Sequence, residues 1–135
     1  MLKKTVEYTD YNGNVRKEDF FFNLTKAELA EMNFSVSGGM ERMLTDIIAA
    51  QDMPKIAAVF KEILMKSYGE KSADGRRFVK SEELSKAFSQ TEAYSKIYME
   101  LLSDESGKTA ADFVNGVFPT ELANAVKAET LPAGA

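Results

Sequence analysis

One long segment of the chain constrains the fold more than any other. From Met53 to Asp104 the sequence predicts a long amphipathic helix, a polar turn at Asp74–Gly75 and then one or two further amphipathic helices. In the first helix the apolar residues recur at spacings of three and four, which places them on one helical face. This stripe comprises Ile56, Ala57, Phe60, Ile63, Leu64 and Ser67. The pattern predicts a mainly α fold.

Start and stop signals divide the rest of the chain into short and medium helices. Thr25 followed by Glu28 forms a capping box, and Asp52, Ser81 and Thr91 each precede an apolar-periodic segment. Gly69 fits the end of the long helix. We therefore expect a bundle of five to seven helices within residues 25–128. The inward-facing residues of its first two helices would be Leu29, Met32, Met43, Leu44, Ile47 and Ile48.

The N-terminal residues 1–24 predict a β-hairpin around Asn12–Gly13. A two-residue loop would oppose Glu7 to Glu18, an unfavourable pair of like charges. A three-residue loop over Asn12–Asn14 instead opposes Val6 to Phe20 and Asp10 to Arg16. It also gathers Val6, Tyr8, Phe20 and Phe22 on one face. We favour the longer loop, with this face packed on the helices, which would make the fold α+β, or else on another chain.

The composition fits one domain over residues 1–128, followed by a disordered tail over 129–135. The 135 residues carry a net charge of −4, which disfavours nucleic-acid binding because such proteins need a basic surface. No apolar run is long enough to span a bilayer, and no signal-like segment follows Met1, so a soluble cytoplasmic protein is expected.

The residue types also limit the chemistry. The chain has neither histidine nor cysteine, so the commonest general base, the commonest metal ligand and the thiolate nucleophile are all missing. The glycines after Ser37 precede a helix but lack the Gly-Lys-Ser/Thr ending of a phosphate-binding loop, and we interpret them as a break between helices. We expect no catalytic residues, no metal and no cofactor.

Two groups of residues are candidates for binding a protein partner. The first is a short apolar helix near the end of the chain, bounded by Gly107 and Pro119, which core packing would explain equally well. The second is a basic loop that includes Arg76 and Arg77, although a solvated turn is the simpler interpretation. The methionines at helical spacing also fit either core packing or an adaptable groove. The apolar residues of the first group are Phe113, Val114, Val117 and Phe118.

Over about residues 3–128 the chain resembles the tail assembly chaperones of long-tailed bacteriophages (siphophages) that infect Gram-positive hosts. The resemblance rests on the order of hairpin and helices and on the closing AADFVNGVFPTEL. Its most specific segments are YGEKSADGRRFVKSEEL at Tyr68–Leu84 and AFSQTEAYSKIYMELL at Ala87–Leu102.

The resemblance implies a non-enzymatic role in viral tail assembly. Such proteins bind the tape measure protein, keep its hydrophobic helices soluble and help tail tube subunits polymerise around it, with self-association possible. They act in the host cell cytoplasm and are absent from the mature virion. Two alternatives remain open. One is a structural tail-completion or connector protein whose hairpin adds to a neighbour's sheet, and the other is a regulatory module that binds a host protein.

Overall fold

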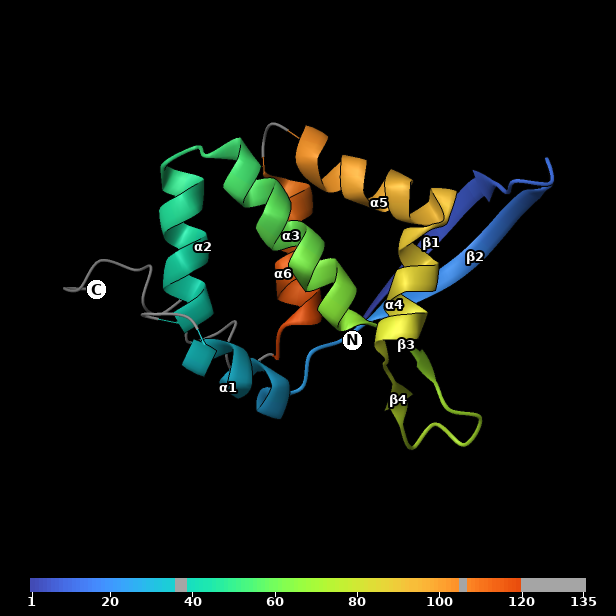
Figure 1. The fold of residues 1–135 in the computed structure, drawn as a ribbon, viewed down its shortest axis with the longest axis horizontal. Coiled ribbons are helices and arrows are strands. Elements are labelled where there is room, and N and C mark those ends of the chain that lie inside the picture. The colour runs from blue at the N-terminus through green and yellow to red at the C-terminus, as the bar shows by residue number, and fades with distance from the viewer. Residues whose placement is uncertain (36–38, 105–106, 120–135) are drawn as a thin grey trace.

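The computed structural model describes residues 1–35, 39–104 and 107–119 (Figure 1). Its strands are β1 (Leu2–Thr9), β2 (Val15–Phe22), β3 (Tyr68–Lys71) and β4 (Phe78–Val79). Its helices are α1 (Lys26–Ser35), α2 (Gly39–Ala49), α3 (Met53–Ser67), α4 (Glu82–Ser89), α5 (Glu92–Ser103) and α6 (Lys108–Val117). The β1–β2 hairpin extends to one end of the molecule, and α1 and α2 lie at the other end.

The strands form one antiparallel sheet in the order β1-β2-β3-β4. The prediction of a mainly α chain is therefore wrong, and the fold is α+β. The sequence of Tyr68–Lys71 indicates a helix end and a polar loop, because four residues are too few to show the alternation of a strand. Long-range pairing with β2 makes this segment a strand, with Phe21 opposite Gly69 and Phe22 opposite Tyr68.

The hairpin is present, but the predicted register is wrong. Val6 lies opposite Glu18 rather than Phe20. The three-residue loop is Tyr11–Gly13, one residue earlier than expected, because the Asp10 carboxylate accepts hydrogen bonds from the N–H groups of Asn12 and Asn14. The partner of each β1 residue thus shifts by two positions along β2. Because side chains alternate between the faces of a strand, a shift of two leaves each side chain on its predicted face. The four side chains expected on one face are all buried: Val6, Tyr8, Phe20 and Phe22.

The helices begin at the capping residues that the sequence indicates. Thr25 and Glu28 exchange the two hydrogen bonds of a capping box, at 2.9 and 3.1 Å. Asp52, Ser81 and Thr91 each accept a hydrogen bond from an N–H of the first turn of the helix that follows. Each capping side chain is bonded to a residue only three positions further along the chain. These helix starts therefore depend on local sequence and not on distant contacts. The last part of the predicted bundle, residues 120–128, and the predicted tail over 129–135 lie outside the described residues.

Helix α3 passes into β3 with no residue between them. Tyr68 is extended, at φ −66° and ψ 138°, while its N–H still donates to the Leu64 carbonyl of the helix. The carbonyl of Ser67, the last helical residue, accepts a 2.8 Å hydrogen bond from Asn23. Gly69 therefore does not end the helix, as predicted, but lies in the sheet. A Cβ there would come within 2.6 Å of the Phe78 ring, so only glycine allows this approach.

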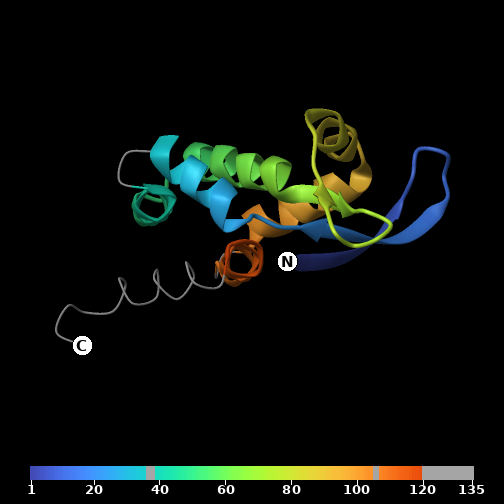
Figure 2. The ribbon, with the colours of Figure 1, turned by 90° about the horizontal axis from the view of Figure 1, so that it is seen from below.

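An aromatic cluster joins the sheet to the helices. Phe22, at the end of β2, is fully buried and contacts the rings of Tyr68, Phe88 and Phe113 at centroid distances of 5.7–5.9 Å. Figure 2 shows the end of β2 lying between α3 and α6. The hairpin thus packs on the helices of its own chain.

Candidate functional site

Helix α6, the first candidate binding element, lies in the core. Phe113, Val117 and Phe118 are at most 5% exposed, and only Val114 reaches the surface in part. The Val117 carbonyl accepts a hydrogen bond from Leu24, and a Cβ at Gly116 would lie 2.9 Å from a methyl carbon of Leu2. Helix α6 is therefore packed closely against the N-terminal part of the chain. A partner could reach its buried rings only if α6 left this position.

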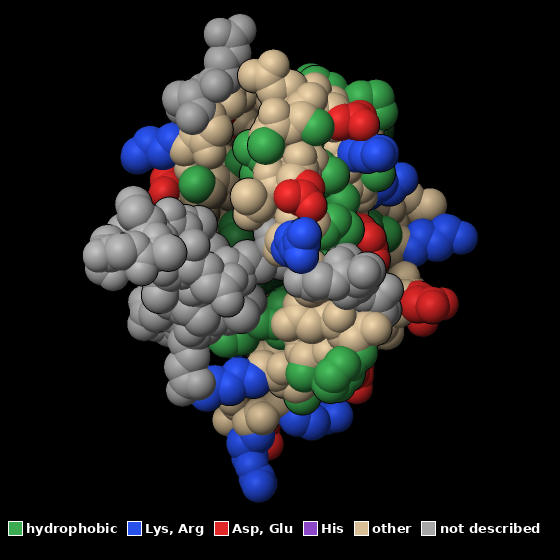
Figure 3. Space-filling model, turned by 90° about the vertical axis from the view of Figure 1, so that its left-hand side faces the viewer, with side chains coloured by type: hydrophobic (Ala, Val, Ile, Leu, Met, Phe, Trp, Pro, Cys, Tyr) green, Lys and Arg blue, Asp and Glu red, His purple; other side chains and the backbone are tan. Residues whose placement is uncertain are grey.

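An apolar groove lies between α2, α3, α5 and α6, with a volume of about 480 Å³. Val114 of α6 lies in its wall, beside residues from each of the other three helices. When the molecule is viewed from the α2 side, hydrophobic side chains reach the surface at several places between single charged groups (Figure 3). The lining includes Leu44, Ile48, Met53, Ile56, Phe60, Leu101, Leu102, Ala110, Val114 and Phe118.

Two hydrophobic side chains at this groove are open to solvent. Ile48, near the end of α2, is 53% exposed, and Met53, at the start of α3, is 50% exposed. The periodicity of α2 predicts that both Ile48 and Leu44 face inward; Leu44 is buried, but the prediction for Ile48 is wrong. Helix α2 lies at the edge of the molecule and contacts the core on one side alone (Figure 1). Helices α1 and α3 therefore cover only part of its apolar stripe, and Ile48 lies in the part that they leave open. This groove is the surface that sequence reasoning missed.

The second predicted group, Arg76 and Arg77, lies on the exposed β3–β4 loop. Ser72 and Asp74 hold this loop, because the Ser72 hydroxyl and the Arg76 N–H both donate to one carboxylate oxygen of Asp74. These two hydrogen bonds lower the pKa of Asp74. The loop projects from the molecule away from α2 (Figure 1), so the structure does not bring the arginines together with the α6 residues. Hydrogen bonds join residues within the loop, and none of its residues lines the groove.

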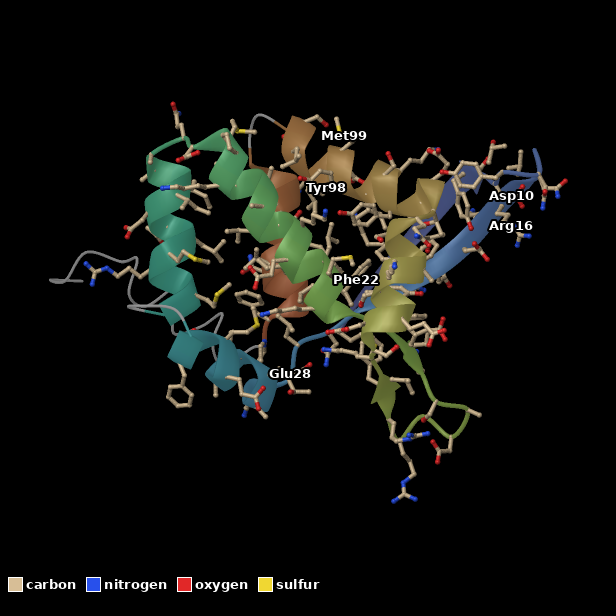
Figure 4. The ribbon with its side chains drawn as sticks, in the orientation of Figure 1. Asp10, Arg16, Phe22, Glu28, Tyr98 and Met99 are labelled. Carbon is tan, nitrogen blue, oxygen red and sulfur yellow. The ribbon has the colours of Figure 1, made fainter. Side chains whose placement is uncertain are left out.

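A more polar hollow of about 500 Å³ lies between α1, α3 and α4. On its wall, Lys80 donates to both carboxylate oxygens of Glu28, at 2.7 and 2.8 Å, and also to the carbonyl of Asn23. Burial raises the pKa of Glu28, but hydrogen bonds from Lys80 and from the Thr25 N–H outweigh it, so the pKa lies below its ordinary value. Figure 4 shows Glu28 on α1. This ion pair connects α1 to the segment before α4. We interpret it as a contact that stabilises the fold and not as a binding site.

Two features are absent from the described part of the chain. No group of three or more acidic residues in the ranges 1–35, 39–104 and 107–119 is placed to hold a metal ion. Within the same ranges, no helix is both long and apolar enough to cross a membrane.

A family model described as "Phage tail assembly chaperone" matches residues 1–134. The chain belongs to this family. No curated protein and no solved structure matched the chain.

A phage tail assembly chaperone acts during assembly in the host cell, and membership of this family implies binding to tail proteins and suggests a non-enzymatic role. The requirement is a surface that covers apolar segments of another protein until they are assembled. In this tail assembly chaperone, the groove beside Ile48 and Met53 exposes apolar side chains, whereas the Phe113 ring is buried in the core.

Proposed function

We propose that this tail assembly chaperone binds the tape measure protein and keeps its apolar helices soluble until tail tube subunits polymerise around them. The observation that carries the proposal is the apolar groove between α2, α3, α5 and α6, with Ile48 and Met53 exposed beside it. A groove walled by helices suits an amphipathic helix, which lays its apolar face into the groove. A tape measure protein, as a long helical protein, supplies many such faces.

The proposal extends to the fate of the protein. A chaperone covers its client only until the tube replaces it, so we expect this chain in the host cytoplasm during infection and not in the finished particle. The tail tube protein is the second expected partner, because its polymerisation must displace the chaperone. Arg76 and Arg77, on a loop far from the groove, remain candidates for this second contact. Val114 and Phe118 line the groove and are proposed contacts there, whereas Phe113 and Val117 are buried in the core.

Co-expression tests the proposal directly. The soluble yield of the tape measure protein should rise when the chaperone is co-expressed, and the two should co-purify, because apolar helices that otherwise aggregate are covered. A matched culture that expresses an unrelated acidic helical protein controls for general effects on expression. An unchanged soluble fraction without co-purification would reject the proposal. Detection of this chain as a regular component of purified particles would favour a structural tail-completion or connector protein instead.

A further inference from the structure

The groove between α2, α3, α5 and α6 has the size and walls of a binding site for side chains. Its volume of about 480 Å³ falls in the range of sites that hold small ligands, roughly 300–1,000 Å³. All four walls are helices, so no free strand edge is present there to pair with an extended peptide. The walls contribute Leu44 from α2, Ile56 from α3, Leu102 from α5 and Val114 from α6. These features favour an occupant that inserts apolar side chains from a helix.

The charged side chains around the groove indicate which charge the occupant carries. Among the described lining residues, Asp104 is the one ionisable side chain, and its carboxylate accepts hydrogen bonds from the N–H and hydroxyl of Thr109. Two cations on the flanking helices face carboxylates: Lys55 lies 3.7 Å from Asp52, and Lys108 lies 3.6 Å from Asp112. The chain as a whole carries a charge of −4. An acidic group at the groove would be repelled, and a basic one attracted.

We propose that this groove binds an amphipathic helix of a tail protein whose apolar stripe is flanked by basic rather than acidic side chains. The inference rests on the proposed function and adds where the client binds and which charge it carries there. The client's apolar side chains fill the space beside Val114 and cover Ile48 and Met53, while its basic side chains lie toward Asp104. Helix α6 stays in the core and serves as one wall.

The absence of cysteine from the 135 residues allows a direct test by cross-linking. Ile48→Cys, at the groove, and Val15→Cys, on the hairpin and 70% exposed, each receive a benzophenone label in the full-length chain. Each labelled chaperone is irradiated in complex with the co-expressed tape measure protein, and the linked peptides are identified by mass spectrometry. We expect Ile48→Cys to link to a helical client segment with basic flanks, and Val15→Cys to give no link to that segment.

Every other result counts against the inference. Links from Ile48→Cys to a second copy, or to residues 120–135 of the same chain, would assign the groove a different occupant. A complex that co-purifies without any link at Ile48→Cys would place the client elsewhere and leave the proposed function intact. Failure of the complex to form at all, with every label, would overturn the proposed function and this inference with it.

A charge comparison tests the chemistry of the occupant. Met53→Lys should weaken client binding about fivefold to tenfold, because it removes an apolar contact and adds a repulsive charge. Met53→Glu should weaken it less. The matched control is Met99→Lys, since Met99 is 55% exposed on α5 and does not line the groove, whereas the neighbouring Tyr98 points toward α3 (Figure 4). Equal effects of Met53→Lys and Met53→Glu would reject the basic client, and an equal effect of Met99→Lys would reject the site.

Discussion

Replacing one buried and one exposed phenylalanine by alanine tests whether α6 belongs to the core. Phe113 is 2% exposed and packs edge-on against Phe22, with ring centroids 5.7 Å apart at 69°. Phe34, on α1, is 89% exposed. The chemical change is the same at both positions, so any difference in the free energy of unfolding reports burial. The pair therefore separates packing from the intrinsic effects of the substitution.

The two substitutions are expected to change the free energy of unfolding by amounts that differ by several kcal/mol. Phe113→Ala removes a buried ring and leaves a cavity, which costs about 3–5 kcal/mol. For a chain of this length such a loss lowers the melting temperature by roughly 10–20 °C. Phe34→Ala changes a solvated surface and should stay within about 0.5 kcal/mol. Since small domains are stable by only about 5–15 kcal/mol, Phe113→Ala should remove a large part of the total.

Urea denaturation followed by far-ultraviolet circular dichroism measures both effects, and capture of the tape measure protein is assayed in parallel. If Phe113→Ala keeps the wild-type free energy of unfolding but loses client capture, the reasoning is refuted. Helix α6 would then be only loosely docked, and its rings would bind the client themselves. A loss of stability with Phe113→Ala, together with unchanged capture at a temperature where the variant is folded, supports α6 as a wall of the groove.

Three further predictions concern the loops and the ion pair. Arg76→Ala and Arg77→Ala should each change the free energy of unfolding by less than about 0.5 kcal/mol in urea, and a larger loss would show that the guanidinium groups hold the loop. Gly69→Ala should destabilise the protein by about 1–3 kcal/mol, because its Cβ would lie 2.6 Å from the Phe78 ring and 2.8 Å from the Val79 carbonyl oxygen; wild-type stability would mean that β4 is not held there. Folding lowers the pKa of Glu28, so the stability that this group contributes is present above its ordinary value of 4.5 and is lost as the pH falls through the lower folded value. Glu28→Gln should therefore flatten the dependence of unfolding free energy on pH below about pH 4.5, and an unchanged slope in acid would contradict this role for the Lys80–Glu28 pair.

The helices could be predicted from the sequence because their signals are local. Thr25 with Glu28, and Ser81 before α4, fix helix starts through hydrogen bonds to residues three positions away. The apolar stripe of α3 is also correct in its buried part, since Phe60, Ile63 and Leu64 are at most 2% exposed. Periodicity identifies a face reliably when the whole face is covered by other helices.

The sheet and the groove depend on contacts that no short pattern contains. Strand β3 exists because Phe21 and Phe22 pair with Tyr68 and Gly69, residues more than forty positions away. The position of the hairpin turn is fixed by hydrogen bonds to the side chain of Asp10. The predicted register considered only which side chains would face each other across the strands, so it did not include this effect. Exposure of Ile48 reflects how far α1 and α3 extend over α2, which is set by tertiary packing.

The direct passage of α3 into β3 has a consequence for how the molecule opens. With no linker, the last turn of the helix and the first pair of the β2–β3 ladder share the Ser67–Tyr68 peptide, and the hydrogen bond from Asn23 to Ser67 crosses between them. Neither can fray alone, because separating the strand pulls on the helix end. The amide hydrogens of Asn23 and Tyr68 should then exchange with solvent at one common rate, as parts of one cooperative unit. One wall of the groove is thus anchored to the sheet, so a client can be taken up and released while that wall stays in place.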